Sequence, residues 1–105
     1  MKTIMVQYKT TEALADENAA LVRAVFDELA AVRPGGIRYA SYRRAGDANF
    51  VHIATIDTPN ENPLSALPSF KNFQSQLRAR CVEAPVVTEL SRLGSYGEGA
   101  YGEGA

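Results

Sequence analysis

Residues 50–56, with the sequence FVHIATI, are apolar on both faces of an extended chain. Successive side chains of a strand point to opposite sides, so Val51 and Ile53 lie on one side and the apolar residues at even positions lie on the other. A strand in which neither face suits water has to lie in a sheet that is covered on both sides. This segment therefore requires a helical layer over one face and a second cover over the other.

The segments before it predict one strand and one amphipathic helix. Residues 2–9 alternate between faces and are rich in β-branched and aromatic types, which is typical of a strand. Between residues 11 and 32, apolar side chains recur every three or four positions, the spacing of a helix with one buried stripe. Acidic residues in its first turns suit the helix dipole, and the sequence RPGG at residues 33–36 ends it.

A hairpin is expected to lead into residues 50–56. Residues 37–44 predict a second strand, and residues 45–49, AGDAN, have the length and turn chemistry of a hairpin loop. The two strands should therefore be antiparallel neighbours.

The last third of the domain predicts a second helix and a fourth strand. Ser69 is expected to cap the helix, which follows a short turn beginning at Pro63. The apolar positions of the helix keep three- and four-residue spacing: Phe70, Phe73, Leu77 and Cys81. Residues 83–85 would end the helix, and residues 86–93 would form the strand.

The predicted order of elements is β-α-β-β-α-β, which defines a ferredoxin-like α+β fold. Two right-handed crossovers place both helices on one face of a four-stranded antiparallel sheet and leave the other face bare. Because residues 50–56 need cover on both sides, we expect a second copy of the chain on the bare face. That arrangement is a homodimer whose two sheets face each other as a dimeric α+β barrel.

One domain at residues 1–94 accounts for all of these elements, and residues 95–105 form a tail. Within the tail the sequence YGEGA occurs twice in succession, at residues 96–100 and 101–105. Glycine and glutamate at this density do not support a packed element, so the composition predicts a flexible segment.

Composition argues against several partners. Eleven lysines and arginines stand against twelve acidic residues, a net charge of −1, so the domain as a whole has no basic field to hold a phosphate backbone, and nucleic acid is not expected as a partner. No apolar run approaches the ~20 residues that a membrane span needs, so no membrane partner is expected. Cys81 is the single cysteine, which forbids an internal disulfide and favours the cytoplasm. One histidine without a cluster of further ligands predicts no metal.

His52, the only histidine, is the first candidate for chemistry. It lies in mid-strand on the same face as Phe50 and Ala54, and an imidazole with a reference pKa of about 6.5 suits proton transfer from a phenol. The alternative is a partly buried histidine that is hydrogen-bonded within the sheet or the dimer interface.

Aromatic side chains could complete a ligand pocket beside this histidine. Tyr39 could share the catalytic proton transfer, since its hydroxyl can orient an aromatic ligand. The expected pocket walls are aromatic: Tyr8, Tyr42, Phe70 and Phe73. Each of them could instead serve only as core or interface packing. Arginines of the second strand and helix could pair with an anionic ligand or simply face water: Arg38, Arg43, Arg44, Arg78 and Arg80.

Residues 67–73, LPSFKNF, resemble the small-Pro-x-aromatic-x-x-Phe opening of the second helix in the antibiotic-biosynthesis-monooxygenase-like family, and FVHI at residues 50–53 resembles the strand before it. The resemblance covers about residues 2–94. It implies a homodimer with a pocket between sheet and helices in each subunit. Some members use that pocket for cofactor-independent oxygenation of quinols or polyketide anthrones, and others for haem breakdown.

The chain also departs from the family pattern. Many members carry an acid near the end of the third strand followed by an aromatic residue, where this chain has Ala54 or Thr55 and then Ile56. Residues 60–68 lack the histidine found before the second helix in those members, and the chain has no tryptophan. The tryptophan-dependent haem-degrading and anthrone-oxidising sites are therefore not expected here.

Two functions follow. The first is a monooxygenase without a cofactor that acts on a small aromatic quinol or polyketide-like phenol, with His52 and Tyr39 handling the proton. The second is a dimeric module without catalysis that binds a hydrophobic small molecule or only self-assembles. A cavity below roughly 300 Å³ would argue against a sizeable ligand and favour the second function.

Overall fold

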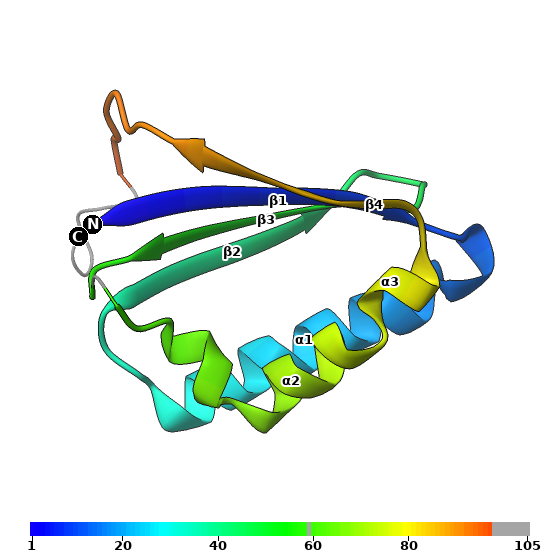
Figure 1. The fold of residues 1–105 in the computed structure, drawn as a ribbon, viewed down its shortest axis with the longest axis horizontal. Coiled ribbons are helices and arrows are strands. Elements are labelled where there is room, and N and C mark those ends of the chain that lie inside the picture. The colour runs from blue at the N-terminus through cyan, green and yellow to red at the C-terminus, as the bar shows by residue number, and fades with distance from the viewer. Residues whose placement is uncertain (59, 98–105) are drawn as a thin grey trace.

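The computed structural model describes residues 1–58 and 60–97, and these form one antiparallel sheet with helices on one side (Figure 1). The sheet has the strand order β2-β3-β1-β4. Its strands are β1 (Lys2–Thr10), β2 (Ile37–Arg43), β3 (Asn49–Ile56) and β4 (Cys81–Leu90). The helices are α1 (Ala15–Val32), α2 (Pro68–Ser75) and α3 (Leu77–Arg80), with 3-10 turns at Glu12–Leu14 and Pro63–Ala66. The predicted α+β fold and the order of its elements are confirmed.

The strand register decides which side chains face the helices. His52 of β3 lies opposite Val6 of β1 and Ser41 of β2, and Val6 lies opposite Val87 of β4. Side chains at even positions of β1 and β3 point toward α1 and α2. Tyr8 and the buried even-numbered residues of β3 are among those that pack under these helices. We call this side the covered face of the sheet and the opposite side the bare face.

Helix α1 packs on the covered face through small and β-branched side chains. Its buried residues lie every three or four positions along the helix: Ala15, Asn18, Ala19, Val22 and Val25. The helix ends at Arg33, whose left-handed backbone (φ 52°) lets its N–H reach the carbonyl of Leu29. This termination matches the prediction for residues 33–36.

The start of α2 differs from the prediction. Ser69 lies inside the helix, which begins at Pro68 after an extended Leu67. The backbone N–H and the hydroxyl of Ser69 both donate to the Glu28 carboxylate of α1, at 2.9 Å and 2.6 Å. These two bonds lower the pKa of Glu28. Ser69 therefore joins the two long helices instead of capping one.

The end of the second helical segment also differs from the prediction. Helix α2 stops at Ser75, α3 adds one turn, and β4 begins at Cys81 instead of residue 86. Pro85, expected to precede the strand, lies within it. Ala84 and Pro85 together face one residue of β1, which makes a bulge between the pairs Gln7–Val86 and Lys9–Glu83.

The bulge explains how a strand accepts Pro85. Proline has no N–H to donate to a ladder, so strands tolerate it at bulges and along sheet edges. Among the described strands, β4 pairs with β1 alone and so lies at an edge of the sheet. The strand ends at Leu90, three residues before the predicted end, and residues 91–97 are exposed and form no helix or strand. Residues 98–105 of the predicted tail lie outside the described residues.

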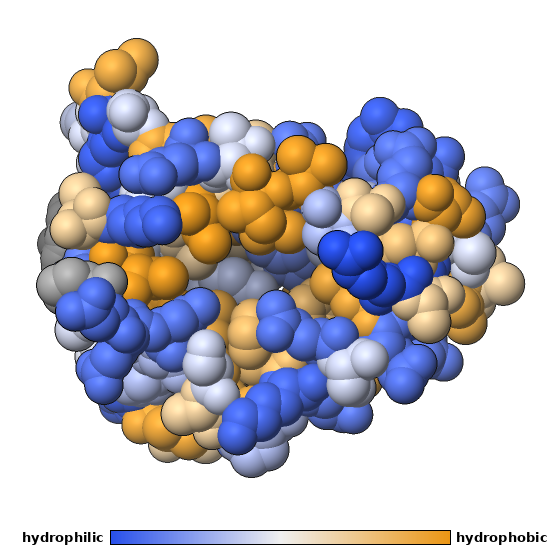
Figure 2. Space-filling model, viewed as in Figure 1, coloured by the Kyte–Doolittle hydropathy of each residue, from blue (hydrophilic) through white to orange (hydrophobic). Residues whose placement is uncertain are grey.

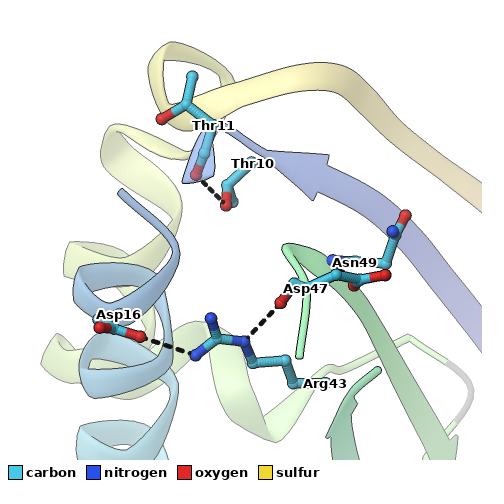
Figure 3. A network of polar contacts seen from close by, with 6 residues as sticks. All are labelled: Thr10, Thr11, Asp16, Arg43, Asp47 and Asn49. Atoms are coloured by element: carbon cyan, nitrogen blue, oxygen red, sulfur yellow. Dashed lines mark hydrogen bonds and ion pairs between the residues drawn. The ribbon is translucent and has the colours of Figure 1, made fainter. Parts of the chain in front are cut away.

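Polar contacts fasten the β2–β3 hairpin to the start of α1 (Figure 3). The Arg43 guanidinium donates to the carbonyl oxygen of Asp47 in the hairpin loop at 2.7 Å and to the Asp16 carboxylate at 2.9 Å. Asp47 in turn accepts from the backbone N–H of Asn49 at 2.8 Å. These surface contacts connect the hairpin loop to the first turn of α1.

No described helix covers the bare face, and the segment after β4, residues 91–94, lines a surface hollow on it together with Tyr42, Ile53 and Thr55. This face carries Met5, Val51 and Ile53 at its centre, with Tyr42 of β2 59% exposed and Val86 of β4 60% exposed. None of the described helices is both long enough and apolar enough to cross a membrane.

Candidate functional site

A cavity of about 190 Å³ lies between the covered face and the helical layer. In Figure 2 apolar side chains surround a hollow between the sheet above and the helices below. All four strands, the turn before α2, and helices α2 and α3 contribute to the lining: Ile4, Val6, Tyr8, Tyr39, His52, Ala54, Asn62, Leu64, Phe70, Phe73, Gln74, Leu77 and Val87. The wall is therefore mostly apolar, with polar groups from the sheet (Tyr8, Tyr39 and His52) and from the helical side (Asn62 and Gln74).

A chain of buried hydrogen bonds runs behind this wall. It begins at Arg80, 2% exposed, whose Nε donates to Asn18 Oδ1 at 2.9 Å and whose Nη2 donates to the Phe73 carbonyl at 2.7 Å. Asn18, fully buried in α1, then donates from Nδ2 to the Tyr8 hydroxyl at 2.9 Å. The Tyr8 hydroxyl meets His52 Nε2 at 2.7 Å.

His52 continues the chain on its other side. Its Nδ1 lies 2.6 Å from the Ser41 hydroxyl and 3.1 Å from the Tyr39 hydroxyl. Ser41 lies directly opposite His52 in the register, while Tyr8 and Tyr39 are diagonal neighbours on the two flanking strands. The hydroxyl groups that contact the His52 imidazole therefore all come from the two strands beside β3, and no loop residue is needed to place them.

Aromatic rings hold this chain in place. The rings of Phe26, Tyr39, His52, Tyr8 and Phe50 form a continuous row of stacked pairs, with centroids 5.1–6.0 Å apart and interplanar angles of 11–14°. Phe73 meets His52 at 5.5 Å and Tyr8 at 6.4 Å in tilted contacts from the helix side. Stacked and tilted rings at such distances fix side-chain orientation as well as burying area.

Burial controls the protonation of the chain. It lowers the pKa of His52, 4% exposed, to about 4, so the imidazole is neutral at pH 7. Burial also raises the pKa of Tyr8, against the lowering effect of the Asn18 hydrogen bond. The pKa of Tyr39 is raised by burial too, and its hydrogen bond from Ser41 opposes that shift. At neutral pH both phenols keep their protons.

Arg80 is a buried cation without an ion pair among the described acids. Its neighbours are the Asn18 amide, the last turn of α2 through the Phe73 carbonyl, and the Phe73 ring 5.5 Å from the guanidinium carbon. A carbonyl of the last helical turn carries partial negative charge, and an aromatic face attracts a cation. These dipoles replace a carboxylate as the partners of the charge.

Most of the sequence-predicted site residues line the cavity. Tyr8, Tyr39, His52, Phe70 and Phe73 all do so. Tyr42 does not line it, because β2 turns that side chain to the bare face next to Val51.

Two residues extend the chain into the helices, and neither has the role expected from the sequence: Asn18 was not among the candidates, and Arg80, expected to meet an anionic ligand or face water, is buried on neutral partners. Asn18 precedes Val22 by four positions and Val25 by seven, which places it on the apolar stripe. Arg80 follows Leu77 by three positions and Phe73 by seven and so continues the stripe of the second helical segment. A polar residue in phase with an apolar stripe was the sign that could have identified both.

Among residues 1–58 and 60–97, no group of three or more histidine, cysteine, aspartate or glutamate side chains could hold a metal ion. The polar atoms at the cavity are hydroxyls, amides and one imidazole. Such groups orient a small organic ligand by hydrogen bonds.

Comparison with known proteins assigns the fold. No family model matches the chain, and no curated protein matches it. Several solved structures are similar. Rv0793 from Mycobacterium tuberculosis is 18% identical with a TM-score of 0.71, and the match covers 91% of this chain and 98% of that one. A protein from Caulobacter crescentus provisionally named an antibiotic biosynthesis monooxygenase is 16% identical with a TM-score of 0.69, over 89% of this chain and 90% of that one, and PA3566 from Pseudomonas aeruginosa is 17% identical with a TM-score of 0.71, over 89% and 94%.

These comparisons confirm the structural resemblance to the antibiotic biosynthesis monooxygenases, whose fold is the α+β barrel expected from the sequence. At 16–18% identity the similarity concerns the fold. A shared fold hosts different reactions, so the function has to be argued from the cavity.

Proposed function

We propose that this chain is a cofactor-independent monooxygenase that acts on a single-ring quinol. The observation that carries the proposal is the His52–Tyr39–Tyr8 cluster, which lines a mostly apolar cavity. An apolar enclosure with a few convergent polar groups is typical of a site for a small aromatic molecule. The fold shared with structures named as monooxygenases agrees with oxygen chemistry.

The size of the cavity narrows the substrate class. Its volume of about 190 Å³ falls below the 300 Å³ expected for a drug-sized ligand. A cavity of roughly 150 Å³ is nevertheless large enough to bind benzene. A polyketide-like phenol with several fused rings is therefore disfavoured, and one substituted ring fits.

A quinol can supply every electron that the reaction needs. For hydroquinone the balanced reaction is hydroquinone plus O₂ to 2-hydroxy-1,4-benzoquinone plus water. One oxygen atom forms the new bond to a ring carbon, and the other takes two hydrogens and leaves as water. In this scheme Tyr39 meets the substrate oxygen, while His52 and Tyr8 hold the hydroxyl cluster in position.

Oxygen consumption tests the proposal. Hydroquinone and methylhydroquinone would be supplied to the full chain, and oxygen uptake would be measured against the protein-free background. We expect one O₂ consumed per quinol without accumulation of peroxide. Tyr39→Phe and His52→Gln should each lower the rate at least about tenfold, whereas Tyr42→Phe on the bare face should not. Equal rates in all four proteins would contradict a catalytic role for this cluster.

Two observations favour a second candidate, a binding module without catalysis: the cavity is smaller than about 300 Å³, and His52 is a weak base. An imidazole whose pKa is about 4 is a weak base, about six units below a phenol with a pKa near 10, so it cannot hold a phenolic proton at neutral pH. Saturable binding of a quinol without oxygen uptake would support this candidate.

The proposal includes a homodimer. The bare face exposes Tyr42 and Val86 around a row of half-buried apolar residues, and a second copy of that face is a complementary cover. Two sheets joined in this way would leave both cavities on the outer, helical sides.

A further inference from the structure

The hydrogen-bond chain behind the cavity has one allowed direction. A guanidinium can only donate, so Arg80 Nε requires Asn18 to present its oxygen. The Asn18 amide nitrogen then donates to the Tyr8 oxygen, which leaves the Tyr8 proton for His52 Nε2. His52 Nε2 therefore accepts, and the neutral imidazole carries its proton on Nδ1.

This direction controls the protons at the cavity. With Nδ1 protonated, His52 donates to Ser41, 2.6 Å away, and cannot accept from either neighbouring hydroxyl. The Ser41 and Tyr39 hydroxyls then hold two protons and have no nitrogen to receive them, so at least one proton has to point out of the cluster. Of these two hydroxyls only that of Tyr39 belongs to a residue lining the cavity, so Tyr39 is the one that can direct its proton there.

We propose that Arg80 and Asn18 fix this direction so that Tyr39 offers its proton to the cavity, which makes the site selective for a single ring bearing an acceptor oxygen. A quinolate anion or a quinone carbonyl is such a ligand. The inference rests on the proposed function and deepens it, since it assigns the bound form of the substrate. A quinol would leave its proton in water and bind as the anion, the form richer in electrons toward O₂.

The chain also explains why a weakly basic histidine suffices. An anion that arrives without its proton needs a donor, and preorganised donors stabilise such charge without reorganisation. His52 acts as a positioning residue that keeps the Tyr39 proton turned outward. Arg80 is the fixed end of the chain, because a guanidinium has N–H donors and no acceptor.

The protonation of His52 tests the inference directly. His52 is the only histidine, so its ring nitrogens give one unambiguous set of signals in long-range ¹H–¹⁵N spectra of the full chain at pH 7. We expect a protonated Nδ1 and an unprotonated Nε2. The opposite pattern, or rapid exchange between the two, would overturn the proposal without any substitution.

Ligand selectivity is the second measurement. Pyridine N-oxide has an acceptor oxygen and no proton to give, while toluene has a similar shape and no polar atom. Chemical-shift titration of wild type and Tyr39→Phe should show a fivefold to tenfold loss of affinity for pyridine N-oxide and no loss for toluene. The same loss for both probes would mean that Tyr39 contributes shape alone.

Asn18→Asp reverses the direction of the chain with almost no change in shape. The introduced carboxylate can pair with the buried Arg80 and accept the Tyr8 proton, so the Tyr8 oxygen should accept from His52 Nε2–H. His52 Nδ1 would then accept the hydroxyl protons. We expect the tautomer to switch and affinity for pyridine N-oxide to fall fivefold to tenfold. A folded variant with an unchanged tautomer would contradict the role of Asn18. If the variant does not fold, the tautomer in the wild-type spectrum and the ligand affinities of Tyr39→Phe still test the proposal.

These outcomes are separable from the proposed function. Pyridine N-oxide binding needs no turnover, so the expected tautomer and selectivity without oxygen uptake would refute the monooxygenase and keep the inference. Oxygen uptake together with a protonated Nε2 would support the monooxygenase and refute the inference.

Discussion

The two faces of the sheet differ in what lies over them. The covered face, under the helices, carries His52, Ser41 and two tyrosines in one hydrogen-bonded chain among apolar side chains. The bare face, which no described helix covers, leaves large apolar side chains exposed, Tyr42 and Val86 among them. The polar groups of the covered face therefore gather at a cavity that suits a small ligand, whereas the bare face is where we propose contact with a second protein surface.

The largest expected effect tests the bare face. Ile53→Asp places a carboxylate at the centre of the proposed dimer, and two-fold symmetry applies each change twice. We expect the dimer dissociation constant to rise at least about a thousandfold, through two unpaired buried charges. Sedimentation should show wild type at twice the 11.4 kDa chain mass and the variant at that mass. A wild-type mass near 11 kDa at micromolar concentration would refute the dimer.

The next effect tests the covered face. Asn18→Leu removes the acceptor of the buried Arg80 and the donor to Tyr8 while keeping the volume similar. We expect the free energy of unfolding to fall by about 3 kcal/mol, because a hydrogen bond to a buried charge is lost and its partners stay buried. Asn72→Leu, on the exposed side of α2, should change it by less than about 0.5 kcal/mol in the same urea titrations. Equal losses would mean that the chain does not stabilise the fold.

An intermediate effect depends on pH. The pKa of His52 is about 4 in the fold and about 6.5 in an unfolded chain, so the unfolded state binds more protons between these values. Stability is therefore full above pH 6.5 and falls as the pH decreases toward 4, by about 2 kcal/mol between pH 7 and pH 5. His52→Gln should flatten this part of the profile. A wild-type profile that is already flat would contradict burial of a neutral imidazole.

The smallest effect belongs to the surface contact between the hairpin and α1. A double-mutant cycle with Arg43→Ala and Asp16→Ala should give a coupling energy of about 0.5 kcal/mol, since exposed ion pairs contribute little. The coupling should shrink further in 1 M salt. A coupling above about 2 kcal/mol would mean that this contact is as important as the buried chain.

The sequence was sufficient for the fold because periodicity and turn chemistry agree along most of the chain. The two-sided strand at residues 50–56, the stripe of α1 and the hairpin loop each predict one element, and together they allow one order. Ser69 and the start of β4 were predicted wrongly because tertiary partners decide them. Glu28 on a distant helix takes the Ser69 donors, and pairing with β1 extends the strand back to Cys81 through a bulge.

The site was predictable only in part. Alternation in β1, β2 and β3 brings Tyr8, Tyr39 and His52 to one face once the register is known, but the sequence does not give the register. The burial of Asn18 and Arg80 does not follow from their residue types, because polar side chains are usually exposed. Both residues have the spacing of the apolar stripe of their helical segment, and this spacing places them in the interior despite their polarity. A buried hydrogen-bond partner on another element offsets the cost of removing them from water.

The position of β1 in the sheet has a consequence for how quickly the chain folds. β1 pairs with β3 and with β4, and Thr3 faces Leu90 near the other end of the described chain. Pairing of such distant segments requires closure of a long loop, which slows the folding of topologies rich in long-range contacts. The helix and hairpin between them need only local contacts. We expect docking of β4 to limit the refolding rate, so destabilising substitutions in that strand should slow refolding more than equally destabilising ones in the hairpin.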